Sequence, residues 1–322
     1  MSLELERDRP GRHFGRLAIA HSHDGSAYGQ VVVPLVALVG GAGPTVLLSA
    51  GVHGDEGEGP LALLALAHAL DPAALRGRVI LAPAMNPLAL AAGRRTSPDD
   101  RGNLARLFPG DASGSITERL AAAIGASLLP LADAVLDLHA GGRTLEFVPC
   151  AQVRVPRDAA LAARVRALAL GLGLPRAVFV PAPAEGGTLV AAALARGIPA
   201  LATEIGGAGG VSAHSVAATE AAVRRLLAML GVLTGAPDAP VPSRAMVQAG
   251  ILRAPGAGLF RPGFMLGDIV AIGAAAGTLH DPVRPDRPGE TLCFPAAGEI
   301  VARGVGTMLA AGDALAVLAT AE

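Results

Sequence analysis

Val46-Leu-Leu-Ser-Ala50 is followed directly by Gly51-Val-His-Gly-Asp-Glu-Gly-Glu-Gly-Pro60. The first five residues are an apolar run of strand length, the glycines indicate a loop, and the closing proline suits the first turn of a helix that we expect to reach about Leu70. A buried strand, a loop and a helix in this order are typical of an α/β domain, whose ligands usually bind at the carboxyl ends of the strands. His53 and Glu56 lie in this loop and are the first candidates for a functional site.

Short apolar runs alternate with longer helical patterns along most of the chain, which predicts an α/β fold with a substantially parallel sheet. Ser115 and Glu118 form an S-x-x-E capping box, so a helix should start there. Further strands are expected at Val79–Ala82, Ala134–Leu138, Ala177–Val180 and Ala200–Thr203, and helices at Leu120–Leu129, Leu189–Arg196 and Val216–Leu230.

A change of pattern near residue 240 predicts two domains. Thr234–Pro242 is rich in Pro, Gly and Ala, and short strands between glycines follow it. We therefore expect a catalytic α/β domain at 1–235 and a β-rich domain at 243–322. The tail repeats a turn-then-strand pattern at Met265-Leu-Gly-Asp-Ile-Val270 and Ala310-Ala-Gly-Asp-Ala-Leu315, which resembles a lipoyl-like barrel sandwich with two similar halves.

Composition excludes several classes of function. The net charge of -1 and the aromatic content of 2% argue against a nucleic-acid partner. The sequence contains no lysine, which excludes Schiff-base catalysis and an ordinary Walker lysine, and leaves a structural lid or an oligomer contact as the expected role of the tail. We expect no membrane span and, because the first residues lack a secretory pattern, a cytoplasmic location.

Candidate chemistry lies at three strand ends. His53 and Glu56 follow the first strand, His139 ends the strand at Ala134–Leu138, and Glu204 ends the strand at Ala200–Thr203. Two histidines, one glutamate and a water are the ligand set of catalytic zinc, and a glutamate beside glycines suits a general base. The H-x-x-E pair alone is weak evidence that a surface loop would also explain, and Glu204 could instead be an ion-pair partner or a helix cap.

The motifs AGVHGDE (50–56), DLHAGG (137–142), TEIGG (203–207) and RRTSPDDRGNLARLFPG (94–110) together resemble the succinylglutamate desuccinylase/aspartoacylase family of zinc carboxypeptidase-like hydrolases. The resemblance covers essentially the whole chain, and it is closest to the branch that includes N-acetyl-diaminobutyrate deacetylases. It implies a zinc carboxypeptidase-like mixed, largely parallel sheet flanked by helices, with a smaller barrel-sandwich-like domain at the C-terminus. It also implies one Zn²⁺ per chain.

The resemblance further assigns roles to residues. His53, Glu56 and His139 would bind zinc, and Glu204 would deprotonate the water and later protonate the leaving amine. Arg95, with Arg94 as the alternative, would stabilise the oxyanion, and Arg106 would pair with a substrate carboxylate.

One residue departs from the family pattern. This chain has Ala105 where the family has an asparagine before the second arginine, in the pattern NLNR. The loss of one hydrogen bond to a charged group is worth about 1.5 to 3 kcal/mol, so carboxylate binding could be weaker or the substrate different. Asn103 is the candidate substitute.

The expected reaction is therefore removal of an acetyl or succinyl group from a small anionic N-acylated amino acid. A homo-oligomer is the candidate assembly of the chain. Two alternatives stay open. One is a metallocarboxypeptidase acting on small peptides, and the other is a non-catalytic zinc-binding protein.

Overall fold

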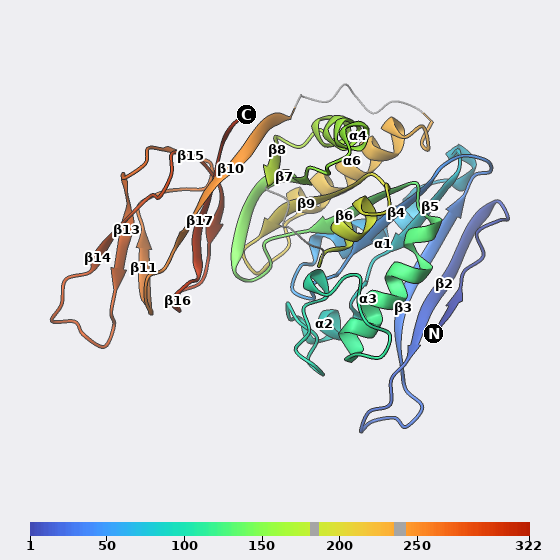
Figure 1. Cartoon of the computed structure of the whole chain (residues 1–322), viewed down its shortest axis with the longest axis horizontal. Helices are drawn as coiled ribbons and strands as arrows, with labels where there is room; N and C mark the ends of the chain where they lie inside the picture. Colours follow the sequence, from blue (N-terminus) through green and yellow to red (C-terminus); the bar gives the residue numbers. More distant parts are fainter. Residues whose placement is uncertain (181–186, 235–242) are drawn as a thin grey trace.

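The computed structural model describes residues 1–180, 187–234 and 243–322. These residues form six α-helices and seventeen strands, thirteen of which make one continuous sheet (Figure 1). The helices are α1 (Glu58–Ala69), α2 (Pro87–Ala92), α3 (Ile116–Ser127), α4 (Ala159–Gly171), α5 (Leu189–Leu194) and α6 (Ala213–Met229), with 3-10 turns η1 (Pro72–Ala74), η2 (Leu104–Arg106) and η3 (Leu129–Leu131). The strands are β1 (Ser2–Glu4), β2 (Gly11–Ala20), β3 (Gln30–Val39), β4 (Thr45–Ala50), β5 (Arg78–Ala82), β6 (Ala134–His139), β7 (Leu145–Arg154), β8 (Arg176–Val180), β9 (Ala200–Gly207), β10 (Arg244–Arg253), β11 (Gly258–Pro262), β12 (Ile269–Val270), β13 (Ala275–His280), β14 (Glu290–Cys293), β15 (Gly298–Gly304), β16 (Met308–Leu309) and β17 (Ala314–Ala321).

The larger sheet has the order β1-β2-β3-β5-β4-β6-β9-β7-β8-β10-β17-β15-β12. Parallel pairing joins β5, β4, β6 and β9, and a second parallel set joins β7, β8 and β10. Every other pair among the described strands is antiparallel, so the sheet is mixed as expected but the prediction of a largely parallel sheet holds only for these two sets. Antiparallel strands need no crossover helix, and the two edges of the sheet have none.

The predicted helix and strand positions in the middle of the chain are largely confirmed. The capping box at Ser115 and Glu118 is present, and α3 begins at the next residue. β9 is longer than predicted and continues to Gly207. Strands β1 to β3 and β7 and helices α2 and α4 were not predicted from the sequence. No described helix has the length and apolar character that a membrane crossing requires.

Strands join the two sides of the predicted boundary. β10 pairs in parallel with β8, and β15 pairs antiparallel with β7, so the main sheet runs from the first part of the chain into the second. The predicted linker Thr234–Pro242 lies, apart from its first residue, outside the described residues. From Ser243 onward the chain forms strands and turns without a helix.

The predicted internal repeat of the tail is visible in its turns. The backbone N–H of Met265 donates to Oδ2 of Asp268 at 2.8 Å, and the N–H of Ala310 donates to Oδ2 of Asp313 at the same distance. Between the two partners, Gly267 and Gly312 each have φ of 91°. A strand follows each turn, so the two sequence copies adopt the same local structure.

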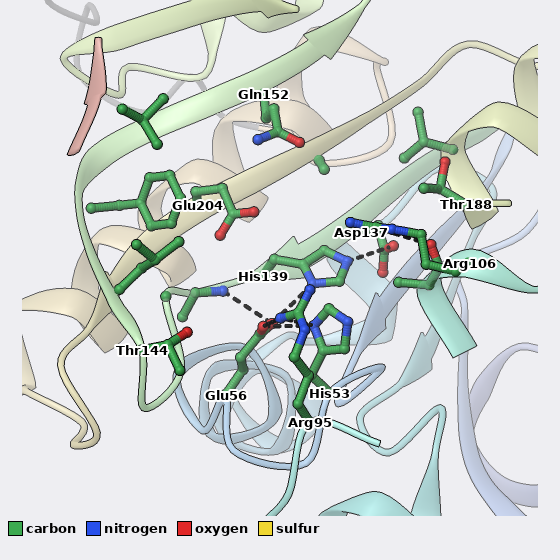
Figure 2. A pocket seen from close by; sticks show the side chains of 18 of the residues that line it. His53, Glu56, Arg95, Arg106, Asp137, His139, Thr144, Gln152, Thr188 and Glu204 are labelled. Carbon is green, nitrogen blue, oxygen red and sulfur yellow. Dashed lines mark hydrogen bonds and ion pairs between the residues drawn. The ribbon is translucent and has the colours of Figure 1, made fainter. Parts of the chain in front are cut away.

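The parallel strands β4, β6 and β9 are neighbours in the sheet, so their carboxyl ends meet at one edge. His139 is the last residue of β6, and its register partner on β9 is Glu204. Both side chains reach the same pocket (Figure 2).

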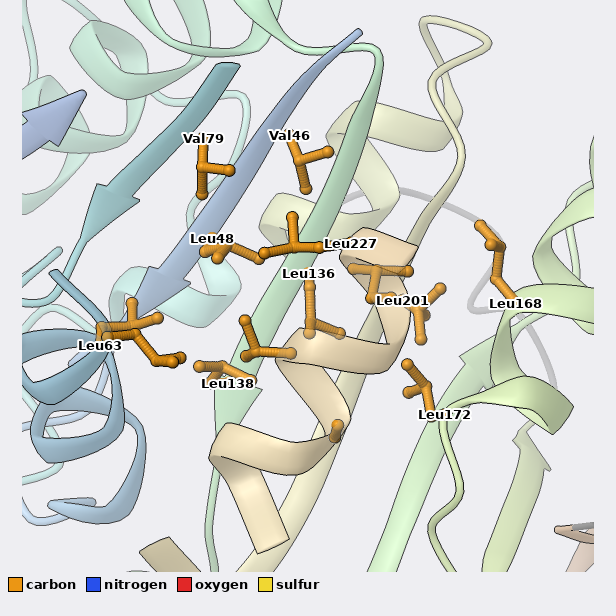
Figure 3. Packing of buried hydrophobic residues seen from close by; sticks show 14 of the residues in the cluster. Val46, Leu48, Leu63, Val79, Leu136, Leu138, Leu168, Leu172, Leu201 and Leu227 are labelled. Atoms are coloured by element: carbon orange, nitrogen blue, oxygen red, sulfur yellow. The ribbon is translucent and has the colours of Figure 1, made fainter. Parts of the chain in front are cut away.

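Both faces of these central strands are covered by helices. On one face, Val46 and Leu48 of β4 pack in a buried cluster with side chains of α1, α4 and α6 (Figure 3). Leu47 points to the other face, where it packs with α3 and α5. Each buried leucine stabilises the fold by roughly 1.5–3 kcal/mol. The central strands that carry the pocket residues are thus fixed by packing on both sides.

Candidate metal centre and active site

The loop after β4 turns sharply to bring two side chains inward. Gly51 has φ of 67°, a conformation that favours glycine. A Cβ atom on Gly54 would lie 1.8 Å from the carbonyl oxygen of Ala89, so only glycine fits there. The N–H of Gly54 donates to the carbonyl of Arg94 at 2.8 Å, which holds the loop against the α2 region. His53 and Glu56 are consequently buried, each with 3% of its surface exposed.

His53, Glu56 and His139 converge on one point, as the sequence predicted. Nδ1 of His53 lies 2.6 Å from Oε1 of Glu56, and Nδ1 of His139 lies 2.9 Å from Oε2. One potential ligand atom from each residue lies within 4.8 Å of the other two. A set of two imidazole nitrogens and one carboxylate is the donor set of catalytic zinc sites, so these residues fit that ion.

Further side chains orient the two imidazoles. Nε2 of His139 lies 3.0 Å from Oδ2 of Asp137, whose Oδ1 accepts a hydrogen bond of 2.7 Å from the hydroxyl of Ser49. Nε2 of His53 lies 3.2 Å from Oδ1 of Asn103. Such contacts select the tautomer that leaves Nδ1 free to coordinate a metal.

The protonation of the cluster suits a cation. Burial works to raise the pKa of Glu56, but the charge and hydrogen bonds of His139 and His53 outweigh it and hold that pKa at about 2. Burial lowers the pKa of His53. Burial also opposes the charged form of His139, yet Asp137 and Glu56 raise its pKa well above the usual value. A metal and a proton compete for Nδ1 of His139, so metal binding here releases a proton.

Glu204 lies beside this cluster without touching it. Burial raises the pKa of its carboxyl to about 8. Its Oε2 is buried and has no hydrogen-bond partner within the described part of the chain. Burial of a carboxyl oxygen without a hydrogen-bond partner costs free energy, so such an atom calls for an explanation such as a catalytic role. A carboxyl with a raised pKa can exchange protons near neutral pH.

A cavity of about 410 Å³ opens onto these residues. That volume suits a small molecule. Its wall includes residues from both predicted domains, because Gln248 and Ile251 of β10 and Val317 of β17 line it together with residues of β6, β7 and β9.

The structure separates the predicted arginines. Arg95 and Arg106 both line the cavity, and Nη1 of Arg95 lies 3.4 Å from Oε1 of Glu56. Arg94 is exposed and is not among the lining residues, so the geometry favours Arg95 as the residue beside the metal ligands.

Asn103 and Ala105 occupy positions that the sequence did not indicate. Asn103 was expected as a substrate contact, but it is not among the lining residues, and its side chain contacts His53 and the N–H of Ala105. Ala105 is buried at 4% exposure and lines the cavity. Asn103 therefore contacts the imidazole of His53 rather than replacing the missing asparagine side chain.

Five polar lining residues outside the quoted motifs were missed in the sequence. They are Thr144 before β7, Gln152 and Arg154 of β7, Thr188 before α5, and Gln248 of β10. None belongs to a local motif that signals chemistry. The positions of Gln152, Arg154 and Gln248 follow from the pairing of β7 with β9 and of β10 with β8, and β7 was not predicted as a strand.

Other acidic and histidine side chains near the motifs have structural roles. Asp55 accepts the N–H of Arg143 at 3.0 Å, and Glu58 accepts the N–H of Gly207 at 2.9 Å. His68 lies on the exposed face of α1, where its ring centroid is 6.3 Å from that of Phe14.

Comparison with known proteins places this geometry in a family. A model of the succinylglutamate desuccinylase/aspartoacylase catalytic domain matches residues 42–230. The chain is 36% identical to the N-alpha-acetyl-L-2,4-diaminobutyric acid deacetylase of Halomonas elongata, across 99% of this chain and 94% of the relative.

Solved structures agree over the full length. The product-bound ectoine utilization protein EutE (DoeB) from Ruegeria pomeroyi matches with a TM-score of 0.94 and 36% identity, covering 99% of this chain and 98% of that one. A succinylglutamate desuccinylase/aspartoacylase from Rhodobacter sphaeroides matches with a TM-score of 0.94 and 33% identity, covering 100% and 98%. The chain belongs to the succinylglutamate desuccinylase/aspartoacylase family and has the mixed α/β fold of its structures.

Proposed function

We propose that this chain is a zinc-dependent hydrolase that removes the acetyl group from an N-acetylated amino acid, with Nα-acetyl-L-2,4-diaminobutyrate as the first substrate to test. The observation that carries the proposal is the convergence of His53, Glu56 and His139 beside Glu204 in a small cavity. The choice of acyl group and amine rests on the full-length similarity to the Halomonas elongata deacetylase. We also propose that residues 1–235 are a zinc carboxypeptidase-like catalytic domain whose pocket the β-rich domain at 243–322 completes.

His53, Glu56 and His139 would hold the ion. Zinc at such a site supplies a Lewis acid that polarises a carbonyl and lowers the pKa of water to about 7. In the proposed reaction the carboxylate of Glu204 accepts the proton of the attacking water and delivers it to the departing amine nitrogen.

The arginines have separate tasks in this proposal. The guanidinium of Arg95, beside Glu56, would face the negative charge that develops on the amide oxygen. Arg106 would bind the carboxylate of the substrate, because its planar fork matches a carboxylate with two hydrogen bonds. Both side chains line the cavity, which is what these roles require.

Acyl release from a substrate panel tests the proposal. The panel contains N-acetyl, N-succinyl and N-formyl amino acids, including Nα-acetyl-L-2,4-diaminobutyrate, and small peptides for the carboxypeptidase alternative. We expect acetate and amine from the N-acetyl amino acid, loss of activity with a chelator, and recovery with zinc. A zinc-loaded protein that cleaves only the peptides, or nothing, would overturn the proposal in favour of one of the two alternatives.

A further inference from the structure

A second arginine lines the cavity with Arg106. Arg154 is the last residue of β7, and its side chain is partly buried. β7 pairs antiparallel with β9, so that Gln152 lies opposite Ala202, two residues before Glu204. Gln152 and Arg154 are two residues apart and therefore project from the same face of β7, into the cavity.

Arg154 and Arg106 form no ion pair with an acidic side chain in the part of the chain that the structure describes. The ion pairs formed within residues 1–180, 187–234 and 243–322 do not include either residue. Among the described residues, the acids that line the cavity are Glu56, Asp137 and Glu204. The first two are held by the histidines, and the third is the proposed proton carrier.

Arg154 is partly buried and Arg106 is exposed, and because both guanidinium groups line the same cavity their positive charges repel each other. Burial lowers the pKa of Arg154, and the positive charge of Arg106 adds to that effect. Burial likewise lowers the pKa of Arg106, with a further contribution from Arg95. Two like charges that line one cavity favour an anion between them, and a carboxylate is an anion that arginine guanidinium groups bind with paired hydrogen bonds.

We infer that Arg154 binds the carboxylate of the substrate together with Arg106. This inference rests on the proposed function, since it takes the substrate to be an N-acyl amino acid. It also supplies a group that compensates for Ala105: where an asparagine is missing from the η2 turn, a second guanidinium reaches the same cavity from β7.

The test pairs a variant with a change in the substrate. The proteins are the zinc-loaded wild type, Arg154→Gln, Arg154→Lys and the control Arg157→Gln, which removes an exposed arginine outside the cavity three residues later. The substrates are Nα-acetyl-L-2,4-diaminobutyrate and the same molecule with its carboxylate converted to a carboxamide. We measure kcat and KM for each combination and the thermal unfolding midpoint of each protein.

Arg154→Gln should lower kcat/KM for the acid about 10- to 100-fold, mainly through KM, and should have little effect on the carboxamide. Arg154→Lys should recover part of the loss because it keeps the charge without the fork. The Arg157→Gln control should match the wild type. An equal loss on both substrates, or no loss on the acid, would overturn the inference.

A binding measurement separates this inference from the proposed function. Calorimetric titration with L-2,4-diaminobutyrate, the product, needs no turnover. If the wild type binds the product but hydrolyses no member of the panel, the proposed function fails, while weaker product binding by Arg154→Gln than by Arg157→Gln still supports the carboxylate site. If both variants bind the product like the wild type, or the wild type does not bind it, the carboxylate site is wrong.

Discussion

His139 and Glu204 are direct register partners on two adjacent parallel strands, β6 and β9. A proposed metal ligand and the proposed proton carrier are thus fixed by backbone pairing in the centre of the sheet, rather than by a flexible loop. Because strand pairing sets the spacing of the two residues, a change of the Glu204 side chain should leave the three converging side chains in place.

Replacement of Glu204 by glutamine should lower turnover at least about 10²- to 10⁴-fold, since general acid–base catalysis is worth that much. The variant should keep its zinc, because Glu204 is not one of the three converging ligands. Acetate release and metal analysis on the same sample check both points. Near-normal turnover in Glu204→Gln would show that another group moves the proton.

Replacement of Asp137 by asparagine should weaken zinc binding about 10- to 100-fold. The carboxylate of Asp137 lies 3.0 Å from Nε2 of His139, and the change removes its charge while keeping its shape. Competition with a chelating dye measures the affinity. Asp133→Asn is the control, because Asp133 lies just before the opposite end of β6, where it accepts the N–H of Thr45. Equal affinities in the two variants would contradict a role for Asp137 in orienting the ligand.

Glu204 should also make the stability of chelator-treated protein depend on pH. Its pKa is raised from 4.5 to about 8 by burial, so between these values the folded state holds a proton that the unfolded chain has released. This contribution to stability is fully present below pH 4.5 and is lost as pH rises through about 8.

Glutamine is neutral throughout, so the unfolding midpoint of Glu204→Gln should rise relative to wild type by a few degrees between pH 5 and 8 and then level off. Thermal unfolding in chelator at each pH measures the difference. Glu290→Gln, on the exposed strand β14, should follow the wild type. A difference between Glu204→Gln and wild type that does not change with pH would rule out a raised pKa.

Replacement of Glu299 by alanine should destabilise the protein by about 1–3 kcal/mol. Glu299 of β15 is 3% exposed and accepts hydrogen bonds from Nε of Arg176 at 2.7 Å and from Nη1 of Arg244 at 3.1 Å. The change leaves both cations without this partner. Urea unfolding measures the loss, and Asp286→Ala, which removes an exposed ion pair with Arg284, should leave the midpoint unchanged. Similar midpoints for the two variants would argue against a structural role of Glu299.

The convergence of His53, Glu56 and His139 was predictable from the sequence because each lies in a short motif at or just after the end of an apolar strand. The central strands were predictable because each is a short apolar run, and the capping box at Ser115 predicted the start of α3. Arg154 and Gln248 were not predictable. They enter the cavity through pairing between strands that are far apart in the sequence, and an isolated arginine or glutamine carries no local signal.

For Asn103, the sequence predicted the segment near the cavity but not the direction of the side chain. Its position next to Ala105 suggested that it could take over the missing side chain, but the turn η2 directs it to His53. The sequence correctly placed this segment beside the cavity, since Ala105 and Arg106 line it. The direction of the side chain depended on the Asn103 hydrogen bond to the backbone of Ala105, which a motif does not specify.

The main sheet brings residues that are far apart in the sequence together in the wall of one cavity. The proposed metal ligands all occur by residue 139, whereas Gln248, Ile251 and Val317 come from the last third of the chain. Substitutions at these three later positions can therefore reshape the cavity without changing the proposed metal ligands or Glu204. In evolutionary terms, substrate preference in such a chain can drift while the hydrolytic chemistry is inherited unchanged.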